Sequence, residues 1–423
     1  MTPVREKNRG KKTAFCIVLL GVFACAGLFA QGLGDVNNDN TLNIVDALMV
    51  AQFAVGLSPA GFHQERADLN ADGRINIVDA LIIAQISVGL ITPPPTQRPT
   101  PTATLQPTSS PARTSSFGFG ADVSEGKYAS EHGVTYKDRN GSPGHYLDIL
   151  RNHGFNWVRV RVLVNPPGDH GLYQTTSYVR EVCQTAKSKG FKVLLVFFYS
   201  DWWCDPGQNS RPAAWPGDQT QLENQLYNYT RDTLNTIGIS NLDMVAVGNE
   251  IDNAMCGATG SNKRRLVDKG YDAVKSVSSL PVMVQSAEGN YSWFSSLGAK
   301  VDVYGISHYI MWHGDLNAMG SRISSFGSRD MWVIETAMYW KRSDAGNSTN
   351  GYAQTQDGQY QYMRDFKTKA QSYANCKGIM YWGATWAQSR SWLYAPQWGN
   401  DDAGTRGLFD DNALATRGIE GWQ

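Results

Sequence analysis

The sequence lacks an excess of charge of either sign, since its 423 residues hold 38 basic and 38 acidic side chains. The first thirty residues carry five of the basic side chains and one acidic side chain, so the remainder holds 33 basic and 37 acidic residues. Nucleic acids and anionic membrane surfaces are bound through clustered positive charge. We therefore expect neither nucleic acid nor a membrane as a partner of the mature chain.

Long apolar runs are also scarce, and one stands out at residues 13–30, directly after the basic start. A basic start followed by an apolar run is typical of a secretory signal peptide. We expect export, with residues 1–30 removed by cleavage after Ala30. A run of about eighteen residues lies at the lower limit for spanning a bilayer, so an uncleaved anchor is the alternative. Lipid attachment at Cys25 is a further alternative.

Cysteines are few. Two of the six would leave with the signal peptide, and four would remain: Cys183, Cys204, Cys256 and Cys376. An even number of cysteines in an exported protein permits disulfides, and four cysteines permit three connectivities.

A segment poor in apolar residues lies at 92–116, where proline, threonine and serine dominate. Such a composition cannot form a core, and its prolines favour extended backbone. We expect this segment to be a linker between two folded units.

An internal repeat precedes this linker. The segment DVNNDNTLNIVDALMVAQFAVGL at Asp35 returns as DLNADGRINIVDALIIAQISVGL at Asp68. Each copy places oxygen-bearing side chains at loop positions 1, 3, 5, 9 and 12, and a backbone carbonyl is expected at position 7. These positions are Asp35, Asn37, Asp39, Thr41, Asn43 and Asp46, then Asp68, Asn70, Asp72, Arg74, Asn76 and Asp79. Ca²⁺ takes six to eight oxygen ligands, so the repeat predicts two calcium loops; Asp- and Asn-rich turns without metal are the alternative.

Residues 34–91 resemble a type I dockerin, because each oxygen-rich loop is followed by apolar residues at helical spacing. The resemblance implies a small all-α calcium-binding domain, and a cohesin or cell-surface scaffold as its partner. Loop positions 10 and 11, which face a cohesin in dockerins, are Ile44-Val45 and Ile77-Val78. They are identical in the two copies but more apolar than the hydroxyl pairs of many dockerins.

Residues 117–423 alternate short apolar runs with polar or amphipathic stretches. The predicted strands are 117–124, 156–164, 192–200, 243–250, 281–287, 301–309, 330–337 and 378–386. Eight strands separated by helical patterns predict an α/β fold, the (β/α)8 TIM barrel. Active sites of such barrels lie at the C-terminal ends of the strands.

Two glutamates lie at such ends: Glu250 follows the fourth predicted strand and Glu335 the seventh. A carboxylate beside a buried apolar strand is costly unless it has a partner or a use. For either residue alone, a helix cap or a salt bridge is the alternative. Together they suit retaining glycoside hydrolysis, which needs two carboxyls about 5–5.5 Å apart, and which requires the pKa values of the two to differ.

The domain at 117–423 resembles glycoside hydrolase family 53, the endo-β-1,4-galactanases. The matching motifs are GADVS at 120–124, WVRVRV at 157–162, YSDWWCDPG at 199–207, AAW at 213–215, VAVGNEID at 245–252, GISHYIMWHG at 305–314, VIETAMYW at 333–340 and YWGATW at 381–386. The resemblance implies endo-hydrolysis of β-1,4-galactan, a plant cell-wall polysaccharide, with retention of configuration and without a cofactor. We expect a monomer.

Carried over by position, the resemblance makes Glu250 the acid/base and Glu335 the nucleophile. Asn249 would hydrogen-bond the sugar 2-hydroxyl. Arg161 would brace the nucleophile electrostatically and Tyr309 would hydrogen-bond it. The residues expected to line the cleft are Trp382, as the floor under the reacting sugar, with Trp312 and His313.

The sequence departs from the family at the third strand, where an Asp-x-His is usual and Val196 and Phe198 stand here. Leu163 also stands where tryptophan is common. These departures bear on sugar preference, so another retaining β-1,4-glycanase activity, on mannan or glucan, is one alternative. A non-catalytic carbohydrate-binding module is the other.

Cys204 follows the third predicted strand and Cys256 the fourth. Adjacent strands lie about 4.8 Å apart, so the loops that follow them can meet. We therefore hypothesise a Cys204–Cys256 disulfide, with free thiols as the alternative.

Overall fold

The computed structural model describes residues 33–39, 41–70, 75–90, 117–342, 346–387 and 404–423. The expected signal peptide at 1–30, the linker at 92–116, and the loop residues Asp72 and Arg74 lie outside these ranges. The chain divides into two compact units, Met1–Ser110 and Pro111–Gln423. No helix in the described ranges is long and apolar enough to cross a membrane.

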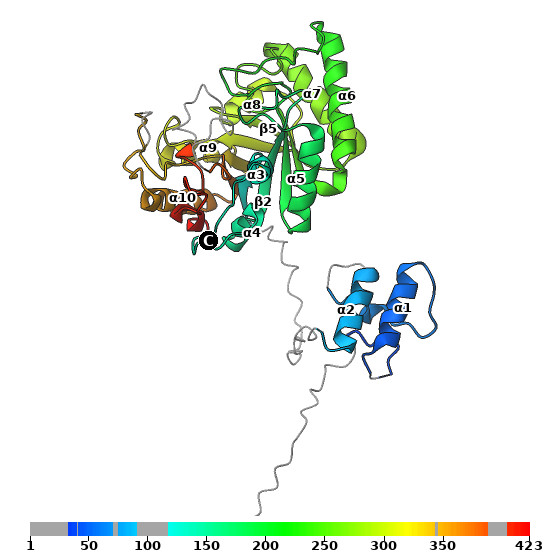
Figure 1. Cartoon of the computed structure of the whole chain (residues 1–423). Helices are drawn as coiled ribbons and strands as arrows, with labels where there is room; N and C mark the ends of the chain where they lie inside the picture. The colour runs from blue at the N-terminus through cyan, green and yellow to red at the C-terminus, as the bar shows by residue number, and fades with distance from the viewer. Residues whose placement is uncertain (1–32, 40, 71–74, 91–116, 343–345, 388–403) are drawn as a thin grey trace, which may run out of the picture. The chain divides into compact units, whose positions relative to one another are not determined.

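The smaller unit is built on two helices, α1 (Ile44–Ala54) and α2 (Ile77–Ser87), drawn in blue in Figure 1. The short 3-10 helix η1 (Gln64–Arg66) lies between them in the sequence. Each helix begins with a capping box, in which an asparagine and the aspartate three residues later satisfy the first backbone N–H groups. The predicted all-α fold is confirmed.

The two helices of the smaller unit pack on a compact apolar core. Its fully buried members include Val36, Val50, Ala67 and Ile83. These come from the first loop, from the residue before the second loop and from both helices, so neither copy of the repeat buries its apolar face alone.

The larger unit is a closed barrel of eight parallel strands in the order β1 to β8 (Figure 1). The strands are β1 (Gly118–Asp122), β2 (Trp157–Val162), β3 (Lys192–Phe197), β4 (Met244–Val247), β5 (Val282–Ser286), β6 (Val303–Ser307), β7 (Met331–Glu335) and β8 (Cys376–Tyr381). The predicted TIM barrel is confirmed. Most strands end a few residues earlier than predicted, because the chain leaves the sheet there to form the loops of the site.

Helices surround these strands. They are α3 (Gly126–Glu131), α4 (Tyr146–Asn152), α5 (Thr176–Ser188), α6 (Gln219–Ile237), α7 (Gly260–Val277), α8 (Tyr291–Leu297), α9 (Leu316–Ser325) and α10 (Gln356–Gln371), with the 3-10 helices η2 (Ile239–Asn241) and η5 (Arg417–Glu420). The longer helices are amphipathic; α5, for example, buries Val179, Val182 and Ala186. The strands are buried along most of their length, which explains their nearly continuous apolar sequence.

One irregularity of the sheet matters for the site. The pairing of β6 with β7 shifts between Ile306 and Ser307, so that Ser307 pairs with Glu335. A register shift of this kind re-aims the side chains that follow it. It sets two polar side chains next to each other at the C-terminal end of two neighbouring strands.

Candidate active site

A pocket of about 310 Å³ opens at the C-terminal ends of the strands. Seven of the eight predicted site residues of the barrel line it: Asn249, Glu250, Tyr309, Trp312, His313, Glu335 and Trp382. The eighth, Arg161, is fully buried and does not line the pocket. Other lining residues were not predicted: Trp203, Cys204, Asp205, Pro206, Ala287, Glu288 and Arg406.

Glu335 ends β7 and is almost completely buried, with 3% of its surface exposed. Its Oε1 accepts hydrogen bonds from Nη2 of Arg159 at 2.7 Å and from Nε2 of Gln285 at 2.8 Å. Its Oε2 accepts one from the hydroxyl of Tyr309 at 2.8 Å, the contact predicted for that tyrosine. Burial, and then the charge of Glu335, raise the pKa of Tyr309, so this hydroxyl stays a donor. Three donors therefore hold the carboxylate in one orientation.

Glu250 lies three residues beyond β4 and is 7% exposed. Its backbone has φ +44°, in the left-handed region that glutamate rarely adopts. The hydroxyl of Ser307 donates to its Oε1. Burial raises the pKa of Glu250 well above its usual value, and the negative charge of Glu335 raises it further. Glu250 is therefore suited to hold a proton beside Glu335.

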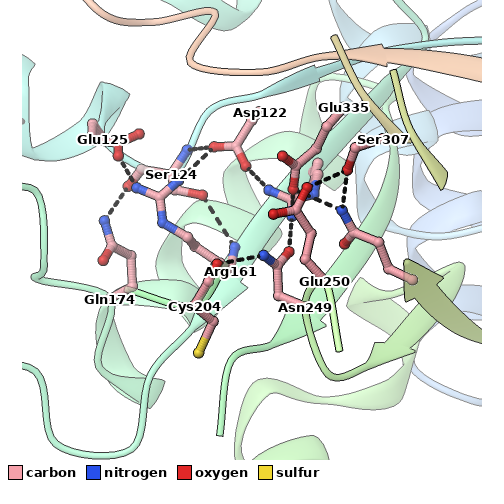
Figure 2. A network of polar contacts seen from close by, with 12 residues as sticks. Asp122, Ser124, Glu125, Arg161, Gln174, Cys204, Asn249, Glu250, Ser307 and Glu335 are labelled. Carbon is pink, nitrogen blue, oxygen red and sulfur yellow. Dashed lines mark hydrogen bonds and ion pairs between the residues drawn. The ribbon is translucent and has the colours of Figure 1, made fainter. Parts of the chain in front are cut away.

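The two glutamates face one another in Figure 2, with Ser307 beside Glu250. Nε2 of Gln285 donates both to Glu335 and, at 3.1 Å, to Oγ of Ser307. Because Ser307 accepts from Gln285, its own hydrogen is free to point at Glu250. A continuous hydrogen-bonded chain, Glu335–Gln285–Ser307–Glu250, thus links the two carboxyls.

Arg159, rather than Arg161, makes the direct contact with Glu335. The charge of Glu335 still acts on Arg161, where it raises the pKa against the larger effect of burial, so electrostatic support of the nucleophile by Arg161 stays a prediction. Both arginines project from β2 to the inside of the barrel, because residues two apart on a strand share a face. Arg161 instead pairs with Asp122 and Glu125, as Figure 2 shows. Asp122 is fully buried and also pairs with Arg159. It therefore joins the two guanidinium groups.

Asn249 precedes the acid/base candidate and is held at both ends of its amide. Its Oδ1 accepts from Nη2 of Arg159 at 2.6 Å, and its Nδ2 donates to the backbone oxygen of Cys204 at 2.8 Å. The amide orientation is thereby fixed, with the second hydrogen of Nδ2 left over. This arrangement suits a donor to a sugar hydroxyl.

Aromatic rings form the walls of the pocket. Trp382 is 6% exposed and lies against both guanidinium groups, 4.8 Å from that of Arg159 and 4.9 Å from that of Arg161. Trp312 is 53% exposed, with the Arg406 guanidinium 5.5 Å from its ring. Trp382 is thus an almost fully buried part of the pocket lining, whereas Trp312 is half exposed at the edge of the pocket.

A backbone hydrogen bond selects one of the two neutral tautomers of His313. Its Nδ1 accepts from the backbone N–H of Tyr309 at 2.8 Å, so the ring proton of the neutral form resides on Nε2. Burial, and then the charge of Arg322, lower the pKa of His313 to about 4. The ring is therefore a neutral N–H donor at the pocket.

Val196 and Phe198, the two residues at the third strand that depart from the family pattern, lie next to Arg161. Phe198 is fully buried, with the Arg161 guanidinium 5.9 Å from its ring, and lies 6.5 Å from Trp203. Val196 pairs with Arg161 in the sheet. The arginine thus faces apolar neighbours on the β3 side, where a polar pair is usual in the family.

The predicted Cys204–Cys256 disulfide is not formed, and that hypothesis was wrong for this structure. All four cysteines in the described ranges are free and buried. The thiol of Cys204 donates to the backbone oxygen of Phe198, and that of Cys256 to the backbone oxygen of Tyr199. Each thiol therefore has its own acceptor at the end of β3.

Side-chain oxygen atoms lie close together in the first loop of the smaller unit. The backbone N–H of Asp39 donates to Oδ1 of Asp35 and to Oδ1 of Asn37. Asp46 and Asp79 are fully buried, and in the described part of the chain no basic side chain pairs with either. No cluster of three or more Asp, Glu, His or Cys in that same part could by itself hold a metal ion. The carboxylates of Asp46 and Asp79 both accept hydrogen bonds from backbone N–H groups. The loop donors also include amide oxygens, and such an all-oxygen set fits Ca²⁺.

A barrel with two buried glutamates at its C-terminal face, one poised to hold a proton, and with an aromatic pocket around them, has the site of a glycoside hydrolase. Residues 118–420 match the family Glycosyl hydrolase family 53, and residues 33–86 match the Dockerin type I domain. The chain belongs to glycosyl hydrolase family 53 and carries a type I dockerin domain.

Known proteins resemble most of the barrel. The endo-beta-1,4-galactanase of Bacillus subtilis is 30% identical over 302 residues, which cover 64% of this chain and 70% of that protein. The probable arabinogalactan endo-beta-1,4-galactanase A of Aspergillus terreus is 28% identical over 308 residues, 64% of this chain and 86% of that protein. The solved GH53 catalytic domain of Ignisphaera aggregans has a TM-score of 0.67 at 28% identity, covering 74% of this chain and 97% of that one.

Proposed function

We propose that this protein cleaves β-1,4-galactan internally, with retention of configuration, and that Glu250 is the acid/base and Glu335 the nucleophile. The observation that carries the mechanism is the contrast between the two carboxyls. Glu335 receives three donors, including a guanidinium group. The pKa of Glu250 is raised by burial and by the charge of Glu335. The galactan specificity is supported by the names of the relatives from Bacillus subtilis and Aspergillus terreus.

The reaction follows from this contrast in two steps. A carboxylate oxygen of Glu335 attacks the anomeric carbon while the glycosidic bond breaks, and Glu250 gives its proton to the leaving oxygen. The released end departs and a covalent glycosyl–enzyme remains. Glu250, now a carboxylate, takes a proton from water as the water oxygen displaces Glu335. Two inversions at the anomeric carbon give retention.

The remaining pocket residues hold the sugar chain in this proposal. Asn249 donates to the 2-hydroxyl of the reacting sugar with its second amide hydrogen. Trp382 forms the floor beneath that sugar, and Trp312 stacks against a neighbouring sugar at the edge. His313 contributes its Nε2–H as a donor to a hydroxyl.

A panel of β-1,4-linked galactan, mannan and glucan tests the proposal. Reducing ends should appear with galactan, and NMR should show the β-anomer as the first product. If reducing ends are released preferentially from mannan or glucan, then that polysaccharide, and not galactan, is the substrate. An α-anomer as the first product would contradict the retaining mechanism. Binding of galactan without any release would make the barrel a carbohydrate-binding module.

We further propose that the dockerin domain binds Ca²⁺ through its two loops and attaches the exported enzyme to a cohesin scaffold. Ile44 and Val45 are 60% and 48% exposed, and their counterparts Ile77 and Val78 are 61% and 47% exposed. Each pair occupies positions 10 and 11 of its loop and forms the start of a helix. Calcium would hold the loop oxygens and thereby orient the start of the helix that presents each apolar pair.

A further inference from the structure

The backbone that carries Glu250 is strained. Gly248 has φ +85° and Glu250 has φ +44°, so two residues of a three-residue turn are left-handed. A Cβ at position 248 would lie 2.6 Å from Cγ2 of Ile251, which explains the glycine there. Glutamate at a left-handed position persists only where its surroundings hold it.

One side chain from another loop makes the contacts that could hold this turn. Asn209, in the loop between β3 and α6, donates from Nδ2 to the backbone oxygen of Asn249 at 3.0 Å and to that of Glu250 at 3.3 Å. Its own backbone oxygen accepts from the N–H of Gly257 at 2.7 Å. Asn209 is 7% exposed. It is therefore fixed against both ends of the segment that carries Glu250.

We propose that Asn209 is a positioning residue that sets the direction of the acid/base Glu250. The amide holds the two successive carbonyls on one side of the turn, and this fixes the left-handed backbone from which the Glu250 side chain leaves. The inference rests on the proposed function, because it assigns Asn209 to the acid/base role of Glu250. Asn209 does not line the pocket, so its effect passes through the backbone of Glu250.

Substrates with leaving groups of different acidity can show whether a variant at Asn209 impairs the positioning of Glu250 or the folding of the protein. A 2,4-dinitrophenyl glycoside departs without a proton, whereas galactan needs the general acid. For Asn209→Ala we expect kcat on galactan to fall about 10- to 100-fold, part of the 10²–10⁴ that general acid catalysis contributes. Its KM for galactan, and its kcat/KM on a dinitrophenyl galactobioside, should stay at the wild-type values.

Two further variants sharpen the test. Asn209→Asp keeps the shape of the side chain but sets a carboxylate against two carbonyl oxygens, so kcat on galactan should fall further than in Asn209→Ala. Asn253 joins the same two loops, since its Nδ2 donates to the backbone oxygen of Pro206 at 2.8 Å. It is exposed and does not hold residues 249 and 250, so Asn253→Ala should change neither substrate's kinetics.

Glu250→Ala is the reference for every comparison. Asn209→Ala added to Glu250→Ala should cause no further loss on galactan, because the group that it positions is already gone. An equal loss on both substrates in Asn209→Ala, or an additive loss in the double variant, would overturn the role of Asn209. If Glu250→Ala itself loses activity equally on both substrates, the proposed acid/base role fails instead.

Discussion

Ser307 donates its hydroxyl hydrogen to Oε1 of Glu250, the residue whose protonation the proposed reaction requires. A donor to a carboxylate favours its ionised form, so Ser307 lowers the pKa of Glu250 against the larger effects of burial and of Glu335. Gln285 orients the serine, because its Nε2 donates to Oγ. The proton affinity of the acid is therefore adjusted by a residue two strands away from it.

Ser307→Ala should shift the alkaline side of the pH–activity profile upward. Glu250 acts as an acid while protonated, so activity falls as the pH rises through its pKa. Without the serine donor this pKa rises, because the charged form of Glu250 loses a hydrogen bond that stabilised it. The measurement is kcat/KM on galactan across pH. A downward shift would mean that the serine stabilises the protonated form.

The two glutamates should respond differently to substitution. Glu335→Ala should abolish turnover of every substrate, because no covalent intermediate can form. Glu250→Ala should retain kcat/KM on a dinitrophenyl galactobioside, and added azide should speed its turnover and yield a β-galactosyl azide. NMR of the azide product checks the assignment. If Glu335→Ala forms the β-galactosyl azide instead, then Glu335 is the acid/base and Glu250 is the nucleophile.

The two arginines of β2 should differ in the same assays. Arg159 donates to Glu335, Asn249 and Asp122 together, which a lysine cannot reproduce. Arg159→Lys should therefore lower kcat by about 10²–10³, as for loss of a directed donor in an active site. Arg161→Lys should lower the denaturant midpoint, because Asp122 and Glu125 lose part of their buried pairing.

For each arginine variant, kcat on galactan and the midpoint of urea unfolding are measured and compared with the wild-type values. If Arg161→Lys had the larger effect on kcat at an unchanged unfolding midpoint, then Arg161 would be the group that supports the nucleophile.

Calcium removal should affect the smaller unit and leave the barrel's chemistry intact. Asp46 and Asp79 are buried carboxylates, and loop ligands repel one another without a cation, so residues 34–91 should lose helix in EGTA. Circular dichroism of the isolated segment, with and without Ca²⁺, measures this. Hydrolysis of soluble galactan by the whole chain in EGTA is the control. Unchanged helicity would contradict calcium-dependent folding.

The strands and the two glutamates could be predicted because their signals are local. A buried strand reads as an apolar run, and the residue that ends it lies at the face where barrels place their sites. The sequence could not show which of Arg159 and Arg161 contacts Glu335. The alternation of side chains along a strand assigns both to the same face, and the two differ only in their depth in the barrel. Sequence periodicity carries no measure of that depth.

Gln285 and Ser307 were missed for a related reason. Each is a polar residue inside an otherwise apolar strand, and that signal was present in PVMVQSA and VDVYGISHY. Their use depends on a contact between neighbouring strands and on the register shift at Ser307. Cys204 and Cys256 were wrongly paired because closeness of two loops does not fix the direction of two thiols.

Trp382 lies against the two guanidinium groups that hold the carboxylates of Glu335 and Asp122. The surface on which a sugar would rest and the group that would attack it are thus parts of a single packed unit. A smaller or rotated ring at position 382 would remove a wall against which both guanidinium groups pack. Substitutions at exposed residues of the edge, such as Trp312 and Glu288, leave the packing of Trp382 on the two arginines in place.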